Sequence, residues 1–151
     1  MLLLLFEIGG GRYALDTNQV LEIVPLVKFK KIPATPDYVA GLMNYRGTGT
    51  PVIDLNQLVD SVSFEDVLST RIIIVNYPVA GRGDRPLALI ANNVTETASV
   101  QMTKPPPAGV IMDKSLYEGE IIPDTNNIIQ WFDLQKTLSD KDITMLFEAD
   151  A

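Results

Sequence analysis

Short apolar segments bounded by glycine, proline or polar residues divide this sequence, and they constrain its fold more than any other feature. The most pronounced is the β-branched run Arg71-Ile72-Ile73-Ile74-Val75, which is typical of a strand buried on both faces. Turn signals recur about every ten residues, as they do in all-β proteins. The length of 151 residues suits a single domain. We therefore predict an all-β barrel or sandwich.

Other segments have the composition of strands and alternate with predicted turns. The glycine triplet at 9–11 predicts a tight hairpin turn, because glycine adopts positive φ without steric cost. Segment 78–86 is rich in glycine and charge, and we expect a loop there. An Asn92-Asn93 bend is expected to separate two strands that pair with 71–75. The predicted strands are 2–8, 12–15, 20–25, 27–32, 51–55, 87–91, 94–101 and 128–133.

Three short helical elements are expected. Asp16 can cap a brief helical turn. Thr35-Pro36-Asp37 has the signature of a helix start, and Gly41 would end that helix. Ser139 would open a C-terminal helix, with Asp142 in its first turn. The apolar face of this last helix would consist of Ile143, Leu146 and Phe147.

The two halves of the chain resemble each other loosely. Each half contains an apolar strand, a hairpin and a strand that ends in Asp-Leu, namely Ile53-Asp54-Leu55 and Phe132-Asp133-Leu134. The polar, irregular segment 60–69 lies between the halves. This pattern favours two related barrels over one large sheet.

Composition excludes several classes of enzyme. The chain has no cysteine and no histidine, which excludes disulfides, thiolate nucleophiles, Cys/His zinc sites and Ser-His-Asp triads. We expect no cofactor and no metal. An enzyme could still use Asp54 or Asp133 as an acid or base, but each lies at a strand-to-turn junction, where aspartate commonly caps.

The net charge of −7 opposes binding to a phosphate backbone, so we expect no nucleic-acid partner. The basic cluster Lys28, Lys30 and Lys31 is interpreted as the solvated face of a strand. The apolar start of the chain is interrupted by Glu7, so it is too short for a signal peptide or a membrane span. We therefore expect a cytoplasmic protein without direct membrane insertion.

One segment, 38–55, favours a binding function. Asn44 and Gly47 are typical turn residues, and the turn would present Arg46 between apolar strands. Arg46 could pair with Asp54 or Glu22 in a purely structural role. It could equally anchor an interface, because arginine is enriched among residues that dominate binding energy. The residues alone leave both roles open.

The sequence resembles the CheW-like domain, the adaptor of bacterial chemosensory arrays. The most specific block has the order Gly-x-x-Asn-x-Arg-Gly-x-x-x-Pro-Val-x-Asp-Leu and runs from Gly41 to Leu55. The resemblance extends over nearly the whole chain. Its other matching segments are 6–8, 13–16, 20–23, 32–33, Pro36, 39–40, 70–75, 87–94 and 132–134.

The resemblance implies two five-stranded SH3-like barrels packed together within a single domain, 1–151. We expect the first barrel over 15–69 and the second over 70–151, with strand 2–8 shared between them or swapped. It also implies a non-catalytic adaptor that is recruited from the cytoplasm to membrane receptor arrays. Its partners would be the cytoplasmic tip of methyl-accepting chemoreceptors and the regulatory domain of a CheA-type histidine kinase. The alternative is a small β-barrel that binds some other protein.

Site residues follow by position from this resemblance. The family engages receptor and kinase at the positions of Val20, Glu22, Gly41, Asn44 and Arg46, and Gly47 supports the turn that places Arg46. The chain departs from the family pattern where apolar or basic residues are usual, at Tyr45, Thr48, Thr50 and Asn56, and 90–94 lacks a frequent Asp. The stretches 12–17 and 44–47 are closer to the adaptors of Wsp-type systems, which control cyclic-di-GMP production and surface behaviour.

Overall fold

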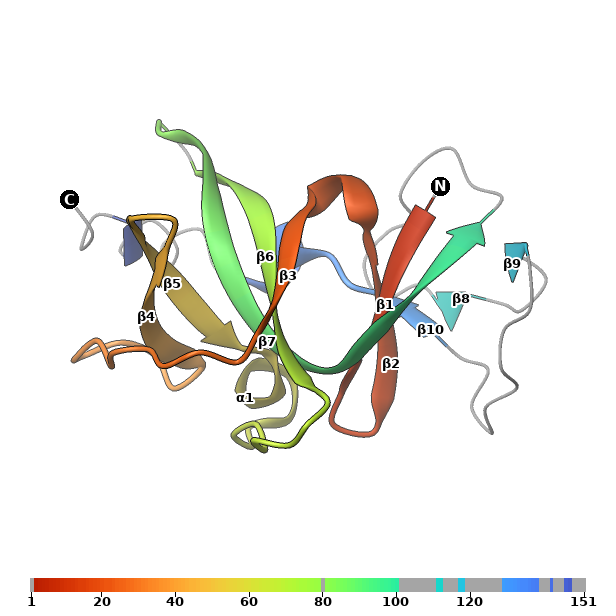
Figure 1. Ribbon diagram of the computed structural model, residues 1–151, viewed down its shortest axis with the longest axis horizontal. Helices are drawn as coiled ribbons and strands as arrows, with labels where there is room; N and C mark the ends of the chain where they lie inside the picture. The colour runs from red at the N-terminus through yellow and green to blue at the C-terminus, as the bar shows by residue number, and fades with distance from the viewer. Residues whose placement is uncertain are drawn as a thin grey trace.

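The computed structural model describes residues 2–79, 81–100, 111–112, 117–118, 129–138, 142 and 146–147. Strands dominate these residues, and the few helices are short, so the predicted all-β class is confirmed (Figure 1). The helical elements are η1 (Thr17–Gln19), α1 (Leu55–Asp60) and α2 (Leu134–Thr137). The strands are β1 (Leu2–Ile8), β2 (Gly11–Asp16), β3 (Val20–Pro25), β4 (Val39–Tyr45), β5 (Thr48–Asp54), β6 (Thr70–Val79), β7 (Gly83–Val100), β8 (Ile111–Met112), β9 (Tyr117–Glu118) and β10 (Ile129–Trp131).

The long strand β7 connects the two ends of the molecule, as Figure 1 shows. Its first part pairs with β6 in antiparallel register, from Val79↔Gly83 to Thr70↔Asn92. Its second part pairs with β1, again antiparallel, out to Leu2↔Ser99. Asn93, between the two parts, has a φ of +49°. The predicted bend at Asn92-Asn93 therefore falls inside one continuous strand. Of the two segments expected to pair with 71–75, 87–91 does so, but the expectation for 94–101 is wrong, because this part of β7 pairs with β1.

Two groups of strands are arranged around β7. At one end β3 pairs with β6, β5 joins β7 in parallel, and β4 pairs with β5. At the other end β1 pairs with β2, β10 lies parallel to β2, and the short β8 and β9 complete the pairing. The strands β3 and β5 precede residue 70, whereas β6 and β7 follow it. Strands from both sides of residue 70 therefore pair with each other, β3 with β6 and β5 with the first part of β7. Segment 2–8 pairs within the second group.

Both faces of the β6–β7 ladder are buried, as the β-branched run predicted. Ile73 and Val75 point into the larger apolar cluster, which also contains Phe6 and Phe132. Ile72 and Ile74 point into a smaller cluster with Met43, Val52, Ala88 and Ile90. Because neighbouring side chains on a strand face opposite sides, one short segment supplies two cores.

Several predictions about local structure are confirmed. Gly9, with a φ of +57°, lies in the turn between β1 and β2. The Asp16 carboxylate caps η1 by accepting a hydrogen bond from the Asn18 backbone N–H at 2.9 Å. Leu146 and Phe147 are helical and buried, whereas Ser139 and Ile143 of the predicted C-terminal helix lie outside the described residues. The helix α2 was not predicted.

The predicted helix from Thr35 to Gly41 is wrong. The Pro36 carbonyl accepts a hydrogen bond from the Val39 N–H at 3.0 Å, which makes a single turn, and the chain then continues as strand β4. Pairing of β4 with β5 over its length outweighs a local capping signature, since a few favourable first-turn residues contribute little against a full ladder.

Two further expectations are also wrong. Segment 27–32 is not a strand, because its only ladder contact among the described residues is an isolated bridge from Lys30 to Leu42. Segment 78–86 is mostly hairpin rather than loop, since β6 runs to Val79 and β7 begins at Gly83. In the sequence, the glycine and charged residues of this hairpin tip have the composition of a loop. No described helix is long and apolar enough to cross a membrane.

Candidate partner-binding site

The tip of the β4–β5 hairpin is a two-residue turn. Tyr45 pairs with Thr48, which leaves Arg46 and Gly47 as the central residues. Their φ values are +50° and +83°, the sign pattern of a type I′ turn. The Asn44 side-chain oxygen accepts a hydrogen bond from the Gly47 N–H at 2.8 Å. The turn therefore holds Arg46 in a left-handed conformation that is unfavourable for a side-chain-bearing residue.

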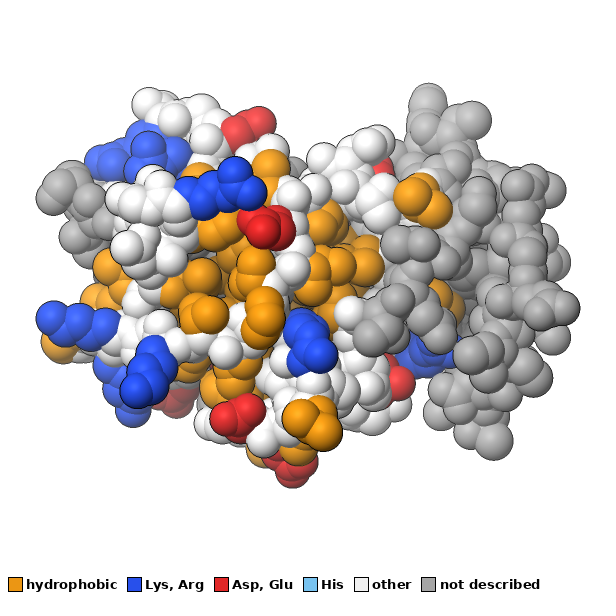
Figure 2. All heavy atoms as spheres, in the orientation of Figure 1, with side chains coloured by type: hydrophobic (Ala, Val, Ile, Leu, Met, Phe, Trp, Pro, Cys, Tyr) orange, Lys and Arg blue, Asp and Glu red, His pale blue; other side chains and the backbone are white. Residues whose placement is uncertain are grey.

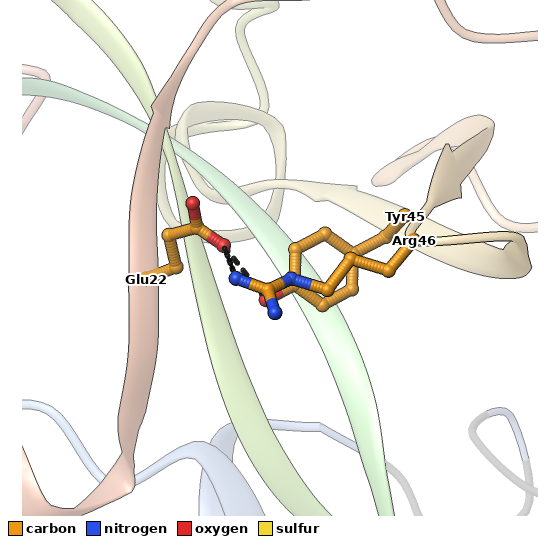
Figure 3. A network of polar contacts seen from close by, with 3 residues as sticks. All are labelled: Glu22, Tyr45 and Arg46. Atoms are coloured by element: carbon orange, nitrogen blue, oxygen red, sulfur yellow. Dashed lines mark hydrogen bonds and ion pairs between the residues drawn. The ribbon is translucent and has the colours of Figure 1, made fainter.

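Arg46 reaches back from this turn to strand β3. Its Nη2 lies 3.1 Å from Oε2 of Glu22, and the Tyr45 hydroxyl donates to the same oxygen at 2.9 Å (Figure 3). The Arg46 guanidinium carbon also lies 5.6 Å from the centre of the Tyr45 ring. These three residues, the Glu22–Tyr45–Arg46 network, tie β3 to the hairpin. Of the two partners that the sequence left open for Arg46, the structure selects Glu22.

The network is exposed and charged at neutral pH. The Arg46 side chain is 74% exposed and the Glu22 side chain 38% exposed. Hydrogen bonds from Tyr45 and then Arg46 lower the pKa of Glu22, against a small opposing effect of desolvation. Burial, followed by the hydrogen bond to Glu22, raises the pKa of the Tyr45 hydroxyl. Glu22 is therefore ionised and Tyr45 protonated at pH 7.

Gly41 has a different place in the structure. It is buried in β4, directly beside Lys30. A Cβ atom on Gly41 would lie 2.3 Å from the Lys30 carbonyl oxygen. The missing side chain lets Lys30 and Leu42 exchange two backbone hydrogen bonds, at 2.8 and 2.7 Å. Gly41 thus allows the segment after β3 to pack on β4.

Val20 also lies apart from the network. It is half-buried at the start of β3 and packs against the larger cluster. The pairing of β3 with β6 shifts register between Val20 and Glu22, which separates the two side chains along the edge of the sheet. Among the expected site residues, the structure brings together Glu22, Asn44, Arg46 and Gly47 at the hairpin tip.

Sequence reasoning missed the apolar side chains next to Glu22. Leu21 is 46% exposed and Ile23 41% exposed, and both lie on β3. Figure 2 shows hydrophobic side chains gathered along this strand beside an adjoining acidic and basic pair. Exposed and partly buried positions alternate from Val20 to Pro25 in the structure, but the sequence Val-Leu-Glu-Ile-Val-Pro shows no matching alternation of apolar and polar residues that could have indicated it. Tyr45 was noted only as a departure from the family pattern, yet it binds Glu22 directly.

Both candidate catalytic aspartates accept hydrogen bonds from the backbone. Asp54 caps α1 through the Asn56 and Gln57 N–H groups and also accepts from the Phe64 N–H at 3.0 Å. Burial raises the pKa of Asp54, while these three bonds act in the opposite direction. Asp133 accepts from the Gln135 N–H at 3.1 Å. In the part of the chain that the structure describes, no three His, Cys, Asp or Glu residues gather as metal ligands.

A family model, the CheW-like domain, matches residues 2–142. The chain is 28% identical over 138 residues to the chemotaxis protein CheW of Bacillus subtilis, covering 90% of this chain and 85% of the relative. It is 24% identical over 147 residues to CheW of Klebsiella aerogenes, covering 95% and 84%. Its structure is similar to the crystal structure of the scaffolding protein TtCheW from Thermoanaerobacter tengcongensis, with a TM-score of 0.70, 26% identity and coverage of 91% and 87%.

A β fold of this architecture with an exposed polar network is typical of an interaction domain. The chain belongs to the CheW-like domain family. It is thereby a CheW-type scaffold protein of chemotaxis signalling.

Replacing Gly41 with alanine tests whether this position is structural. The Cβ would overlap the Lys30 carbonyl, so we expect Gly41→Ala to lower the free energy of unfolding by about 3 kcal/mol, measured by urea denaturation. Gly10→Ala is the matched control, because nothing lies within 4 Å of its Cβ. Its unfolding free energy should change by less than about 0.5 kcal/mol. Equal stability of the two variants would contradict this assignment.

The Tyr45 hydroxyl can be tested through the titration of Glu22. Two hydrogen bonds lower the pKa of Glu22, and the one from Tyr45 has the larger effect. Tyr45→Phe removes this bond, so the pKa of Glu22 should rise toward its ordinary value. NMR titration of the Glu22 carboxyl carbon measures the change. Because the pKa of Glu22 is lower in the folded state, its ionised form stabilises the fold at neutral pH. This stabilisation is lost as the pH falls through the lowered pKa. An unchanged pKa in Tyr45→Phe would show that Glu22 does not accept this hydrogen bond in solution.

Proposed function

We propose that this chain is a non-catalytic adaptor that couples methyl-accepting chemoreceptors to a CheA-type histidine kinase. The partners are the cytoplasmic tip of the receptor and the regulatory domain of the kinase. The protein acts in the cytoplasm and is recruited to receptor arrays at the membrane. Membership of the CheW-like family and the structural similarity to TtCheW, a scaffolding protein, support this proposal.

The observation that carries the proposal is the exposed Glu22–Tyr45–Arg46 network. It places a charged hydrogen-bonding group at the hairpin tip, and the strand that carries Glu22 also exposes Leu21 and Ile23. Arginine is enriched among the residues that dominate binding energy at protein interfaces. We assign partner contact to Glu22, Asn44 and Arg46.

The remaining proposed site residues support these contacts. Gly47 completes the turn that presents Arg46, and Gly41 seats the segment that follows β3 against β4. Val20 anchors the start of β3 on the larger core, which fixes the strand that carries Glu22. A small, partly polar surface of this kind gives weak and reversible contacts. Linked contacts across many adaptors, receptors and kinases then raise the effective affinity.

A binding titration against the regulatory domain of a CheA-type kinase from the same genome tests the proposal. We expect micromolar binding by the wild-type protein, weakened about tenfold or more by Arg46→Ala or Glu22→Lys. Both side chains are exposed, so the melting temperature should move by less than about 3 °C. Lys31→Ala, which removes another exposed cation, should bind like the wild type.

Two results would change this proposal. A loss of several degrees of melting temperature in Arg46→Ala would make the network a structural pair. Absence of kinase binding by a folded wild-type protein would favour a receptor-only scaffold or the alternative of another protein partner. Repeating the titration with a receptor-tip fragment separates these two.

We also propose that the pathway is of the Wsp type, with control of cyclic-di-GMP and surface behaviour as its output. Support comes from the resemblance of 12–17 and 44–47 to those adaptors. Deletion of the gene should then change cellular cyclic-di-GMP on surface contact and leave swimming chemotaxis intact. Loss of swimming chemotaxis with unchanged cyclic-di-GMP would assign the protein to flagellar control instead.

A further inference from the structure

The segment between α1 and β6, residues 61–69, is hydrogen-bonded to its neighbours at both ends although it forms no helix or strand. The Phe64 N–H donates to the Asp54 carboxylate at 3.0 Å. The Thr70 hydroxyl donates to the Glu65 carbonyl oxygen at 2.6 Å. These bonds anchor the segment to α1 at one end and to β6 at the other. Its conformation is therefore fixed by the fold.

This fixed segment nevertheless exposes large apolar side chains. Leu68 is 95% exposed, Val62 65% and Val67 47%. Apolar side chains that stay exposed to water do not stabilise the fold. Where several of them cluster on the surface, they usually mark an interaction site.

Acidic side chains border these apolar residues. Asp66 lines a shallow hollow together with Val67 and Leu68, and the Arg71 side chain donates to the Leu68 carbonyl oxygen nearby. A hollow of about 340 Å³ lies beside the segment, and Asp60, Val62 and Glu65 are among its lining residues. The rest of the described lining is neutral and comes from the β1–β2 turn, α1, the segment itself and β7. We call Asp60, Val62, Glu65 and Leu68 the acidic surface. It fits a partner that offers basic side chains next to apolar ones.

The same chain carries such a segment. Residues 27–31 read Val-Lys-Phe-Lys-Lys, and Val27 and the three lysines are exposed. We call this the basic segment. It adjoins the acidic surface, because the Phe29 and Phe64 rings meet edge to face with centroids 6.3 Å apart. Figure 2 shows the two neighbouring regions, blue at the lower left over the segment between β3 and β4, and orange with red at the lower edge between α1 and β6.

We propose that the acidic surface of one copy of this chain binds the basic segment of a second copy. Adjacent patches of opposite charge form a self-complementary surface, which is the requirement of a two-fold symmetric dimer. Each copy then gives one acidic surface and one basic segment, and Leu68 and Val27 supply apolar contact. This contact uses different residues from those assigned to the kinase and receptor, so it stands or fails independently of the proposed function.

The net charge of −7 makes two copies repel each other at long range. The attraction between the acidic surface and the basic segment acts only at contact distance, so the dimer is weak. Its affinity should nevertheless depend on the sign of the charges at these two patches. Lys30→Glu makes the chain more acidic and Glu65→Lys makes it less acidic. If net repulsion alone governed association, Glu65→Lys would strengthen it. Our proposal requires that both substitutions weaken it.

Sedimentation velocity over a range of protein concentrations tests the dimer. We expect concentration-dependent association of the wild-type protein. Each single charge reversal should weaken it about three- to tenfold, since a two-fold contact contains every substitution twice. The double variant Lys30→Glu/Glu65→Lys keeps the wild-type net charge and restores an opposite pair, so its association should return toward the wild-type value.

Apolar contact is tested with Leu68→Ser, which should weaken association. The matched control is Leu2→Ser, at an exposed leucine on β1. Thermal unfolding verifies that all variants fold. A wild-type protein that stays monomeric up to about 1 mM overturns the proposal. So does association that is unaffected by Leu68→Ser and by both charge reversals, or that Glu65→Lys strengthens.

Discussion

The antiparallel ladder between β6 and β7 is the interaction on which the rest of this structure depends. It runs from Thr70↔Asn92 to Val79↔Gly83, and each of its faces is covered by a separate apolar cluster. Each Å² of apolar surface that is buried contributes about 25 cal/mol to the free energy of folding. Because this ladder buries apolar side chains on both faces, it is a major source of stability. The strands β3 and β5 extend it on either side, because β3 pairs with β6 and β5 with β7.

At the base of the ladder, three strands are joined by side-chain and backbone hydrogen bonds. The Asn93 N–H donates to the Ser69 carbonyl at 3.0 Å, and its side-chain amide donates to the Glu7 carboxylate at 2.6 Å. These bonds hold the start of β6, the bend of β7 and the end of β1 together. The positive φ of Asn93 fits this role, since asparagine tolerates the left-handed region better than other side-chain-bearing residues. β7 can therefore leave one group of strands and join the other without interruption.

Sequence reasoning was reliable where the determinant was local. The β-branched run at 71–75, the glycine turn at 9–11 and the Asp16 and Asp54 caps all depend on residues within a few positions of one another. It failed for β4, whose first residues have the signature of a helix start but pair with a strand further along the chain. Nor could it choose a partner for Arg46, because Glu22 lies 24 residues away and meets it only when β3 and the hairpin tip come together. The prediction that this site binds partners came from the resemblance, whereas Leu21 and Ile23 were found only from their exposure in the structure.

The energetics of the hairpin tip indicate that its residues contribute little to the stability of the fold. Exposed ion pairs contribute little to folding because water screens them and long side chains lose entropy on pairing. Arg46 also occupies a left-handed backbone conformation, which opposes folding. The backbone conformation of Arg46 is unfavourable and its exposed ion pair stabilises the fold only weakly. The stability of the fold therefore does not explain why arginine occupies this position. The Tyr45 hydroxyl donates to Glu22 and its ring lies beside the guanidinium, so the Arg46 side chain is already positioned for the partner contact proposed above. Such preorganisation lowers the entropy lost on binding, which matters most for an interface whose total free energy is small.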